Sequence, residues 1–288
     1  MSLHSSSINN SGNFEDSKFM KKRVSFHTLG CRLNQSETDS LKRSFNQNGY
    51  NVVPESEHAD VCIVNTCTVT EHSDAKNRQL IRRLHRQNPK AIIAVTGCYA
   101  QMDPNAVAGI EGVRLIVGNQ EKMNITEYLK KLNIDNYPLI VRPKIIRKPF
   151  VTNEFSKEPT FENNFSEVHR DSKKQELNNE ISGQRHLRES GINNTRAMLK
   201  IQDGCDFMCS FCIIPFARGR SRFRKFSNLQ KEARLLISEG VREIVITGVN
   251  VGTYNTKKEN IISVVDFLNN LQGLSRIRIS SIEPTTVP

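Results

Sequence analysis

Short apolar runs recur along the first half of this chain, and a polar segment long enough for a helix separates most of them. Several runs are β-branched and apolar throughout, which is typical of strands buried on both faces of a parallel sheet. They occupy residues 23–29, 60–66, 91–97 and 113–118. The segments 36–49 and 74–88, and a shorter one that opens at Asp103, are predicted helices. This alternation predicts an α/β fold, a parallel βαβ sheet with helices on both faces.

The regular pattern stops near residue 142 and resumes near residue 196. Residues 142–195 are polar and rich in Asn and charge, which indicates a linker or mobile loop. Beyond them, strands are predicted at 196–204, 242–248 and 276–282, with helices near 228–240 and 261–272. A chain of 288 residues has room for two cores. We therefore expect a disordered leader (1–22), an N-terminal α/β domain (23–141), the linker (142–195) and a second α/β domain (196–288).

Composition narrows the class of protein. No apolar run approaches the length that spans a bilayer, and residues 1–22 lack the apolar segment of a secretory signal. A cytoplasmic protein without a membrane partner is expected. The net charge of +11 and the isoelectric point near 9.4 favour a polyanionic partner such as nucleic acid. A basic surface that binds nothing specific remains the alternative.

Three cysteines in the second half have a metal-ligand spacing. Cys205, Cys209 and Cys212 form a C-x3-C-x2-C pattern directly after a predicted strand. A zinc site ordinarily needs a fourth ligand from a second arm, which does not follow here. Three thiolates instead suit three irons of a cubane iron–sulfur cluster, and they leave the fourth iron open to a substrate or cofactor. Three buried cysteines without a metal are the alternative.

Three further cysteines are far apart in the first half but occupy equivalent positions. Cys31, Cys67 and Cys98 each follow a predicted strand. Because the loops after parallel strands emerge at one edge of the sheet, these thiols are expected to converge there. Cys62 lies inside an apolar run and is interpreted as a core residue. The alternative is that the three are unrelated, half-buried cysteines.

Six ordered motifs carry a family resemblance. They are "TLGCRLNQSETD" (28–39), "VNTCTVT" (64–70), "TGCYAQ" (96–101), "GCDFMCSFCIIPFARGRSR" (204–222), "ITGVNVGTY" (246–254) and "RISSIEPT" (278–285). Together they resemble the methylthiotransferase family of radical S-adenosylmethionine enzymes. The residues of these motifs most resemble the branch that methylthiolates N6-threonylcarbamoyladenosine beside the tRNA anticodon. The match runs from about residue 23 to 288, and it is poor over 142–195.

The resemblance implies a cofactor set. Two 4Fe-4S clusters are expected, an auxiliary one on the Cys31 trio and a radical-generating one on the Cys205 trio. In this family, one S-adenosylmethionine methylates a sulfur species and a second yields the radical that attacks adenine C2. Phe211, Gly248 and Asn250 are expected at the cofactor site. For "ITGVN", a plain strand and turn is an equally weighted interpretation.

Basic residues are the expected contacts with the tRNA anticodon loop. Arg218, Arg220, Arg222 and Arg224 could neutralise phosphates, and Phe216 and Phe223 are available for base stacking. A basic helix face could add to this footprint, or it is simply a solvated helix face. That face comprises Lys76, Arg78, Arg82, Arg83, Arg86 and Lys90.

The chain departs from the family pattern in its second domain, and other functions compete with the one implied. The family's second domain is a six-stranded partial barrel followed by a small RNA-binding domain, whereas about three of those strands are expected here. A truncated radical S-adenosylmethionine barrel is therefore predicted. An electron donor such as flavodoxin or ferredoxin is implied, and the sulfur donor is not assigned. The alternatives are methylthiotransfer to isopentenyladenosine in tRNA or to a ribosomal protein aspartate, and an inactive truncated iron–sulfur fragment.

Overall fold

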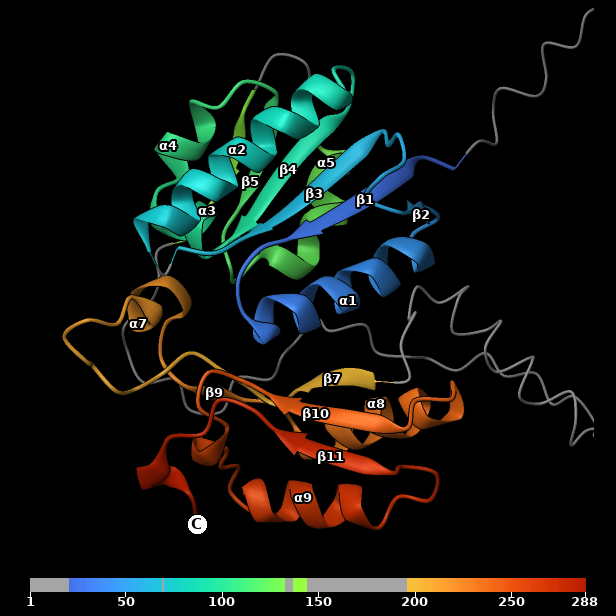
Figure 1. Cartoon of the computed structure of the whole chain (residues 1–288), viewed down its shortest axis with the longest axis vertical. Helices are drawn as coiled ribbons and strands as arrows, with labels where there is room; N and C mark the ends of the chain where they lie inside the picture. The colour runs from blue at the N-terminus through green and yellow to red at the C-terminus, as the bar shows by residue number, and fades with distance from the viewer. Residues whose placement is uncertain (1–20, 69, 133–136, 144–195) are drawn as a thin grey trace, which may run out of the picture.

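Two parallel sheets organise the protein, one in each half of the chain (Figure 1). The computed structural model describes residues 21–68, 70–132, 137–143 and 196–288. The first sheet has the order β2-β1-β3-β4-β5-β6, and the second has the order β11-β10-β7. This confirms the predicted parallel α/β fold. The expected leader and linker lie almost entirely outside the described residues.

The first sheet contains the four predicted strands and two short ones that were not predicted. Its strands are β1 (Arg23–Thr28), β2 (Asn51–Val53), β3 (Val61–Thr66), β4 (Ile92–Gly97), β5 (Val113–Val117) and β6 (Leu139–Val141). Its helices are α1 (Arg32–Gln47), α2 (Glu71–Gln87), α3 (Cys98–Met102), α4 (Pro104–Ala108) and α5 (Ile125–Lys130), with a 3-10 turn at Lys122–Asn124. The new strands β2 and β6 have three residues each, which is too short for a period-2 pattern to appear in the sequence.

Local chemistry explains where the helices of this half begin. The hydroxyl of Thr70 accepts a hydrogen bond from the Ser73 amide at 3.1 Å and so caps α2. The side chain of Asp103 caps α4 in the same way, through the Ala106 amide at 3.0 Å. Helix α1 begins at Arg32, earlier than the predicted residue 36, because Cys31 takes the extended backbone of an N-cap.

Each face of the first sheet has its own apolar core. Helices α1 and α5 cover one face, and α2, α3 and α4 cover the other (Figure 1). Side chains of the first core include Phe26, Leu41, Phe45, Leu115 and Ile125. Side chains of the second include Val64, Ile81, Leu84, Val95 and Ile116. Burial on both faces is the reason that the strands are apolar throughout.

The second sheet is built from three parallel strands. These are β7 (Arg196–Lys200), β10 (Glu243–Thr247) and β11 (Arg276–Ile279), and the long helices are α8 (Phe226–Ser238) and α9 (Ile261–Asn269). A short antiparallel pair, β8 (Gln202–Asp203) and β9 (Arg222–Phe223), flanks α7 (Ile214–Arg218). Single 3-10 turns cover Val251–Thr253 and Pro284–Thr286. The strand predicted over 196–204 is therefore divided, because Ile201 separates β7 from β8.

Helix α1 lies between the two sheets and contacts both (Figure 1). Leu33, Leu41 and Phe45 are buried, and the latter two belong to the first core. On another side of the helix, the Ser36 hydroxyl donates to the Met198 carbonyl of β7 at 3.4 Å. Arg43 forms an ion pair with Glu232 of α8, and both side chains are largely buried. Helix α1 therefore joins the two halves of the described chain.

Removing the Phe45 side chain is expected to destabilise the first half. Phe45 is 0% exposed, and its ring centroid lies 5.2 Å from that of Phe26 in an edge-to-face contact. We expect Phe45→Ala to lower the free energy of unfolding by about 3–5 kcal/mol, as large-to-small core changes do. Chemical denaturation followed by circular dichroism measures this. Phe211→Ala is the matched control because Phe211 is 90% exposed, and an equal loss in both variants would contradict the packing described here.

Candidate functional site

The three N-terminal cysteines lie on loops at one edge of the first sheet. Cys31 is the N-cap of α1, Cys67 follows β3, and Cys98 is the first residue of α3. Strands β1, β3 and β4 are neighbours and run parallel, so the loops that follow them share this edge. Cys31 is exposed, whereas Cys67 and Cys98 are buried. The fold thus brings together loops that are separated by about thirty residues of sequence.

Two glycines allow these loops to approach one another. Gly30 has a φ of +104°, and a Cβ at this position would lie 2.8 Å from the Sγ of Cys67. Gly97 has a φ of +101°, and a Cβ there would lie 2.3 Å from the Thr66 carbonyl oxygen. Glycine adopts this backbone region without the steric cost that other residues pay. The glycine before each of Cys31 and Cys98 therefore positions the loop that carries the thiol.

Each trio supplies donors of one kind, three thiols. Among the described residues, no group of three His, Cys, Asp or Glu side chains is arranged to hold a metal ion. In a cubane cluster each thiolate binds a separate iron. Which cysteines hold a cluster stays a prediction. Cys62 lies apart from this edge, fully buried in the core, where its Sγ accepts from Ser25 at 3.5 Å.

The second trio lies on the loop between β8 and α7. Gly204 has a φ of +72°, and a Cβ there would lie 2.1 Å from the Arg220 carbonyl oxygen, so the two ends of the loop touch. The Cys205 amide donates to the Gly219 carbonyl at 3.1 Å. Burial raises the pKa of the Cys205 thiol, a backbone hydrogen bond from Phe207 opposes this, and the neighbouring Cys212 and Cys209 thiols raise the pKa further. The three thiols therefore lie close enough to influence one another electrostatically.

Gln202 connects this loop to the end of β10. Its Nε2 donates to the Gly204 carbonyl at 2.6 Å, and its Oε1 accepts from the Val249 amide at 2.8 Å and from the Asn250 amide at 3.0 Å. A Cβ at Gly248 would lie 2.9 Å from that same Oε1. Sequence reasoning did not select Gln202, whose side chain is fully buried.

The three expected cofactor residues lie in different surroundings. Gly248 is at the end of β10, where an added side chain would meet Gln202. Asn250 is buried, and its Oδ1 accepts from the Thr286 hydroxyl at 2.9 Å, while its Nδ2 has no hydrogen-bond partner among the described residues. Phe211 is exposed beside the thiols. A cofactor contact by any of the three stays a prediction.

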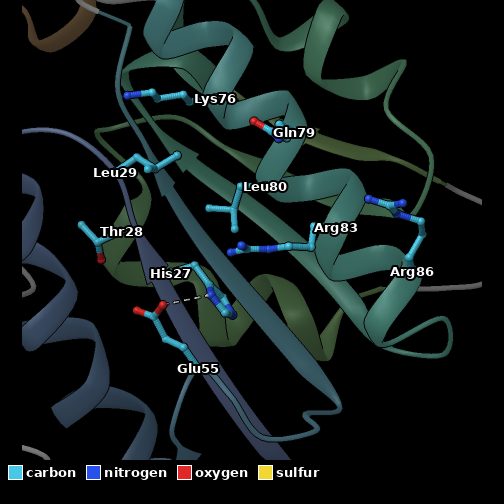
Figure 2. A pocket seen from close by; sticks show the side chains of 9 residues that line it. All are labelled: His27, Thr28, Leu29, Glu55, Lys76, Gln79, Leu80, Arg83 and Arg86. Atoms are coloured by element: carbon cyan, nitrogen blue, oxygen red, sulfur yellow. Dashed lines mark ion pairs between the residues drawn. The ribbon is translucent and has the colours of Figure 1, made fainter.

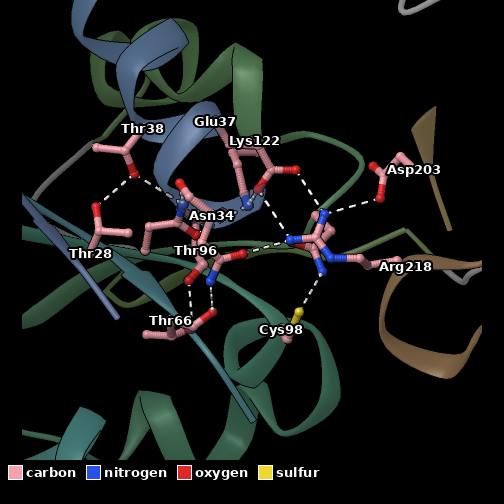
Figure 3. A network of polar contacts seen from close by, with 12 residues as sticks. Thr28, Asn34, Glu37, Thr38, Thr66, Thr96, Cys98, Lys122, Asp203 and Arg218 are labelled. Carbon is pink, nitrogen blue, oxygen red and sulfur yellow. Dashed lines mark hydrogen bonds and ion pairs between the residues drawn. The ribbon is translucent and has the colours of Figure 1, made fainter. Parts of the chain in front are cut away.

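A buried network of ion pairs lies between the edge that carries the first cysteine trio and the segment that carries the second (Figure 3). Glu37 of α1 is 3% exposed and accepts from three cations: Lys122, Lys200 at 2.8 Å and Arg218 at 2.8 Å. Asp203 pairs with Lys200 at 3.1 Å and with Arg218 at 3.0 Å. Glu37 and Lys122 belong to the first half, whereas the other three belong to the second. The carboxylate of Glu37 is therefore an electrostatic joint between the halves.

Burial makes this network depend on its full set of charges. Burial alone would raise the pKa of Glu37, but Arg218, Lys122 and Lys200 hold that pKa well below its ordinary range. Burial lowers the pKa of Lys122, and the Glu37 carboxylate opposes this. Burial would also lower the pKa of Arg218, whereas Glu37 and Cys98 raise it well above its ordinary value. The network therefore stays charged in the interior because each buried group has a partner of opposite charge.

Asn119 adds a direct link between the two trios. Its Nδ2 donates to the Sγ of Cys98 at 3.6 Å and to the Ala217 carbonyl of α7 at 2.8 Å. Helix α7 follows the Cys212 loop directly, and Arg218 at its end lies beside Cys98 (Figure 3). One amide therefore contacts a ligand candidate of the first trio and the helix that leads from the second.

The prediction that four alternating arginines contact RNA is wrong for two of them. Arg218 is 1% exposed and bound to Glu37 and Asp203. Arg224 is 3% exposed and bound to Glu232. Buried arginines that bind carboxylates are not available to an external phosphate. Arg220 and Arg222 are partly exposed, and they pair with Asp206 at 2.8 Å and with Asp203 at 3.0 Å.

Comparisons with known proteins decide the family. Residues 23–118 match the model described as uncharacterized protein family UPF0004, and residues 199–287 match the radical SAM superfamily. The chain is 37% identical to the threonylcarbamoyladenosine tRNA methylthiotransferase MtaB of Bacillus subtilis (strain 168) over 267 residues, covering 92% of this chain and 52% of that protein. It belongs to the methylthiotransferase family of radical S-adenosylmethionine enzymes. The predicted resemblance is confirmed, and the chain spans about half the length of the curated relatives it matches.

Further relatives match the chain over a similar length, and one solved structure shares its fold. The chain is 36% identical to MtaB of Aquifex aeolicus (strain VF5), over 90% of this chain and 56% of that protein. It is 31% identical to the tRNA-2-methylthio-N(6)-dimethylallyladenosine synthase of Clostridium botulinum (strain Hall / ATCC 3502 / NCTC 13319 / Type A), over 89% of this chain and 52% of that protein. The radical S-adenosylmethionine methyltransferase TsrM of Kitasatospora setae has the same fold, with a TM-score of 0.50 and 14% identity, over 86% of this chain and 50% of that one.

The described part of this family member contains no helix that is both long and apolar enough to cross a membrane.

Replacing Glu37 tests the electrostatic joint. Glu37→Gln keeps the shape but leaves buried cations without a charged acceptor, so we expect about 3–5 kcal/mol less stability at neutral pH. Because folding lowers the pKa of Glu37, its contribution is present above the ordinary glutamate pKa and is lost as the pH falls through the folded value. The difference between parent and variant should therefore shrink at acid pH. Chemical denaturation across a pH series measures this.

Asp39→Asn is the matched control for that experiment. Asp39 lies on the same helix with its side chain 46% exposed and contacts Lys42 at 4.0 Å. We expect a change within about 1 kcal/mol, as for other exposed pairs. Equal losses in the two variants would contradict the assignment of the joint to Glu37.

Proposed function

We propose that the protein of this chain is a tRNA methylthiotransferase that adds a methylthio group to C2 of N6-threonylcarbamoyladenosine at position 37 of tRNA. One observation carries the proposal: Asn119 contacts both the Cys98 thiol and the helix that follows Cys212. A radical source and a sulfur-bearing site must both reach the same base in such a reaction. Two thiol trios on adjoining edges meet that requirement.

Each trio is assigned a cofactor in this proposal. Cys31, Cys67 and Cys98 would hold the auxiliary 4Fe-4S cluster, and Cys205, Cys209 and Cys212 the cluster that binds S-adenosylmethionine. When bound, these groups supply a 5'-deoxyadenosyl radical and a methylated sulfur. The second cluster, the domain division at 23–141 and 196–288, and cofactor roles for Phe211, Gly248 and Asn250 belong to the same proposal.

The chain's own residues would prepare this site electrostatically. Arg218 lies beside Cys98 with its buried positive charge, as would suit an anionic cluster ligand (Figure 3). Gln202 ties the Cys205 loop to the end of β10 and so holds both in one position. Asn119 fixes the spacing between the loops. These residues bind and orient, whereas the chemistry of the reaction comes from the cofactors.

The choice of substrate within the family rests on relatives and charge. The MtaB proteins at 36–37% identity are named for threonylcarbamoyladenosine, and a synthase named for dimethylallyladenosine matches at 31%. The net charge of +11 favours RNA over a ribosomal protein aspartate. A tRNA substrate places the enzyme in the cytoplasm, where flavodoxin or ferredoxin would donate electrons. The sulfur donor is left unassigned.

Cysteine substitutions test the two ligand sets. After anaerobic reconstitution, we expect the parent to hold about eight irons per chain and the variant Cys31→Ala/Cys67→Ala/Cys98→Ala about four. The variant Cys205→Ala/Cys209→Ala/Cys212→Ala should also hold about four and should release no 5'-deoxyadenosine. Iron and sulfide analysis with electron paramagnetic resonance measures this. Cys62→Ala is the control, and a loss of iron in that variant would count against the assignment.

The modified nucleoside itself tests the substrate. In cells that lack the complete gene, we expect tRNA to contain N6-threonylcarbamoyladenosine without its methylthio group, and complementation should restore that group. A complementing gene with Cys205→Ala should not restore it. Mass spectrometry of digested tRNA reads both forms. Unchanged threonylcarbamoyladenosine together with loss of methylthio-isopentenyladenosine, or of a modified ribosomal protein, would replace the proposal with the matching alternative.

A further inference from the structure

A groove of about 400 Å³ follows the face of the first sheet beside α2 (Figure 2). Residues 54–60 lead from β2 to β3 without a helix, so none covers β1 on this side. The floor is formed by His27 of β1 and by Leu29, which follows that strand. Helix α2 forms the wall, and its Leu80 also lines the groove (Figure 2). The gap in the helical layer is what opens the groove.

Three cations line the helical wall of the groove. Lys76, Arg83 and Arg86 are exposed, and among the described residues no carboxylate lies within ion-pair distance of them. Their spacing places them on one side of α2 over about 15 Å of helix. The acid that lines the groove, Glu55, is exposed and lies 3.6 Å from the Nδ1 of His27. The groove thus carries an excess of positive charge.

The floor of the groove differs from a simple charged surface. His27 is 3% exposed, and its Nδ1 has no hydrogen-bond partner among the described residues. Burial lowers the pKa of His27; Glu55 opposes this and Arg83 reinforces it. His27, Leu29 and Leu80 line the groove beside the three cations. That combination suits a nucleotide, whose base can pack against the leucines while its phosphate stays at the cations.

One end of the groove reaches the cysteine-bearing edge. Leu29 stands two residues before Cys31, and Lys76 is followed by Asn77, whose Nδ2 donates to the Cys67 carbonyl at 2.5 Å. Arg86 lies in the last turn of α2, at the opposite end of the groove. A strand lying in the groove would therefore lead directly to the first thiol trio.

We propose that this groove binds a strand of the substrate RNA, with phosphates at Lys76, Arg83 and Arg86 and a base over the His27 floor. The proposal rests on the proposed function, because it takes the RNA to be the tRNA that is modified. It assigns the phosphate contacts to the α2 groove, in place of the buried Arg218 and Arg224. A concave site favours a strand over a flat lipid surface.

The test compares two triple variants with equal charge changes in the reconstituted 288-residue chain. The groove variant is Lys76→Gln/Arg83→Gln/Arg86→Gln. The control is Lys130→Gln/Lys231→Gln/Lys257→Gln, whose residues are exposed and lie outside the groove. Fluorescence anisotropy with a labelled tRNA anticodon stem-loop measures affinity over a salt series. Circular dichroism and iron content show that both variants fold and load alike.

We expect the groove variant to bind RNA about tenfold or more weakly and its salt slope to fall by about 2, since each phosphate contact to a single strand contributes about 0.7. The control should retain the parent affinity to within about twofold, because screened charges away from the strand contribute little. An equal loss of RNA affinity in both variants would overturn the assignment of the groove as the RNA site, because net charge alone would then explain the result. No RNA binding by the parent would overturn it as well.

Two competitor molecules test whether the groove binds something other than an RNA strand. Displacement of RNA by poly-glutamate at equal charge concentration would reassign the groove to an acidic protein. Displacement by adenosine monophosphate alone, lost in the groove variant, would reassign it to a free nucleotide. The proposed function is read independently from the tRNA nucleosides of complemented cells. If the parent protein methylthiolates tRNA and the groove variant binds RNA with the parent affinity, the RNA-binding role of the groove is refuted and the proposed function still stands.

Discussion

The carboxylate of Glu37 holds the two halves of this protein together. It is buried among Lys122, Lys200 and Arg218, which come from both halves of the chain, and each cation would be costly to bury without it. The network contains more positive than negative groups, and its Arg218 lies beside Cys98 (Figure 3). The residues that join the halves therefore border one of the predicted cluster ligands.

Helix α1 gives that carboxylate its position. The helix buries apolar residues such as Leu41 and Phe45 against the first sheet, and it presents Ser36 and Arg43 to the second half. Small hydroxyl side chains allow close approach to β7, and the paired charges avoid unsatisfied groups at the interface. Its N-cap is Cys31, so the orientation of a ligand candidate is linked to the packing of both sheets. A substitution that shifts this helix would therefore shift both segments that carry the cysteine trios.

Much of the fold was predictable, because buried parallel strands have a distinctive composition. The strands 23–29, 60–66, 91–97 and 113–118 were found from their apolar runs, and parallel topology then brings the loops of Cys31, Cys67 and Cys98 to one edge. Strands β2 and β6 were missed because three residues carry no period. Gln202, Lys122 and Glu37 were missed for a different reason. A polar residue that will be buried and paired has the same appearance in a sequence as one that faces solvent.

The sequence by itself determined the parallel α/β architecture, the two cysteine trios and the family, since these depend on composition, spacing and local order. Only the tertiary structure decided what the charged residues do. Arg218 and Arg224 looked like ligands for phosphate, yet Glu37, Asp203 and Glu232 surround them in the interior. For Lys76, Arg83 and Arg86 the sequence left open an RNA contact or a solvated helix face, and the structure shows that they line a groove beside β1. The physical reason is that a charge acts through its neighbours and its exposure, and both are set by segments far apart in the chain.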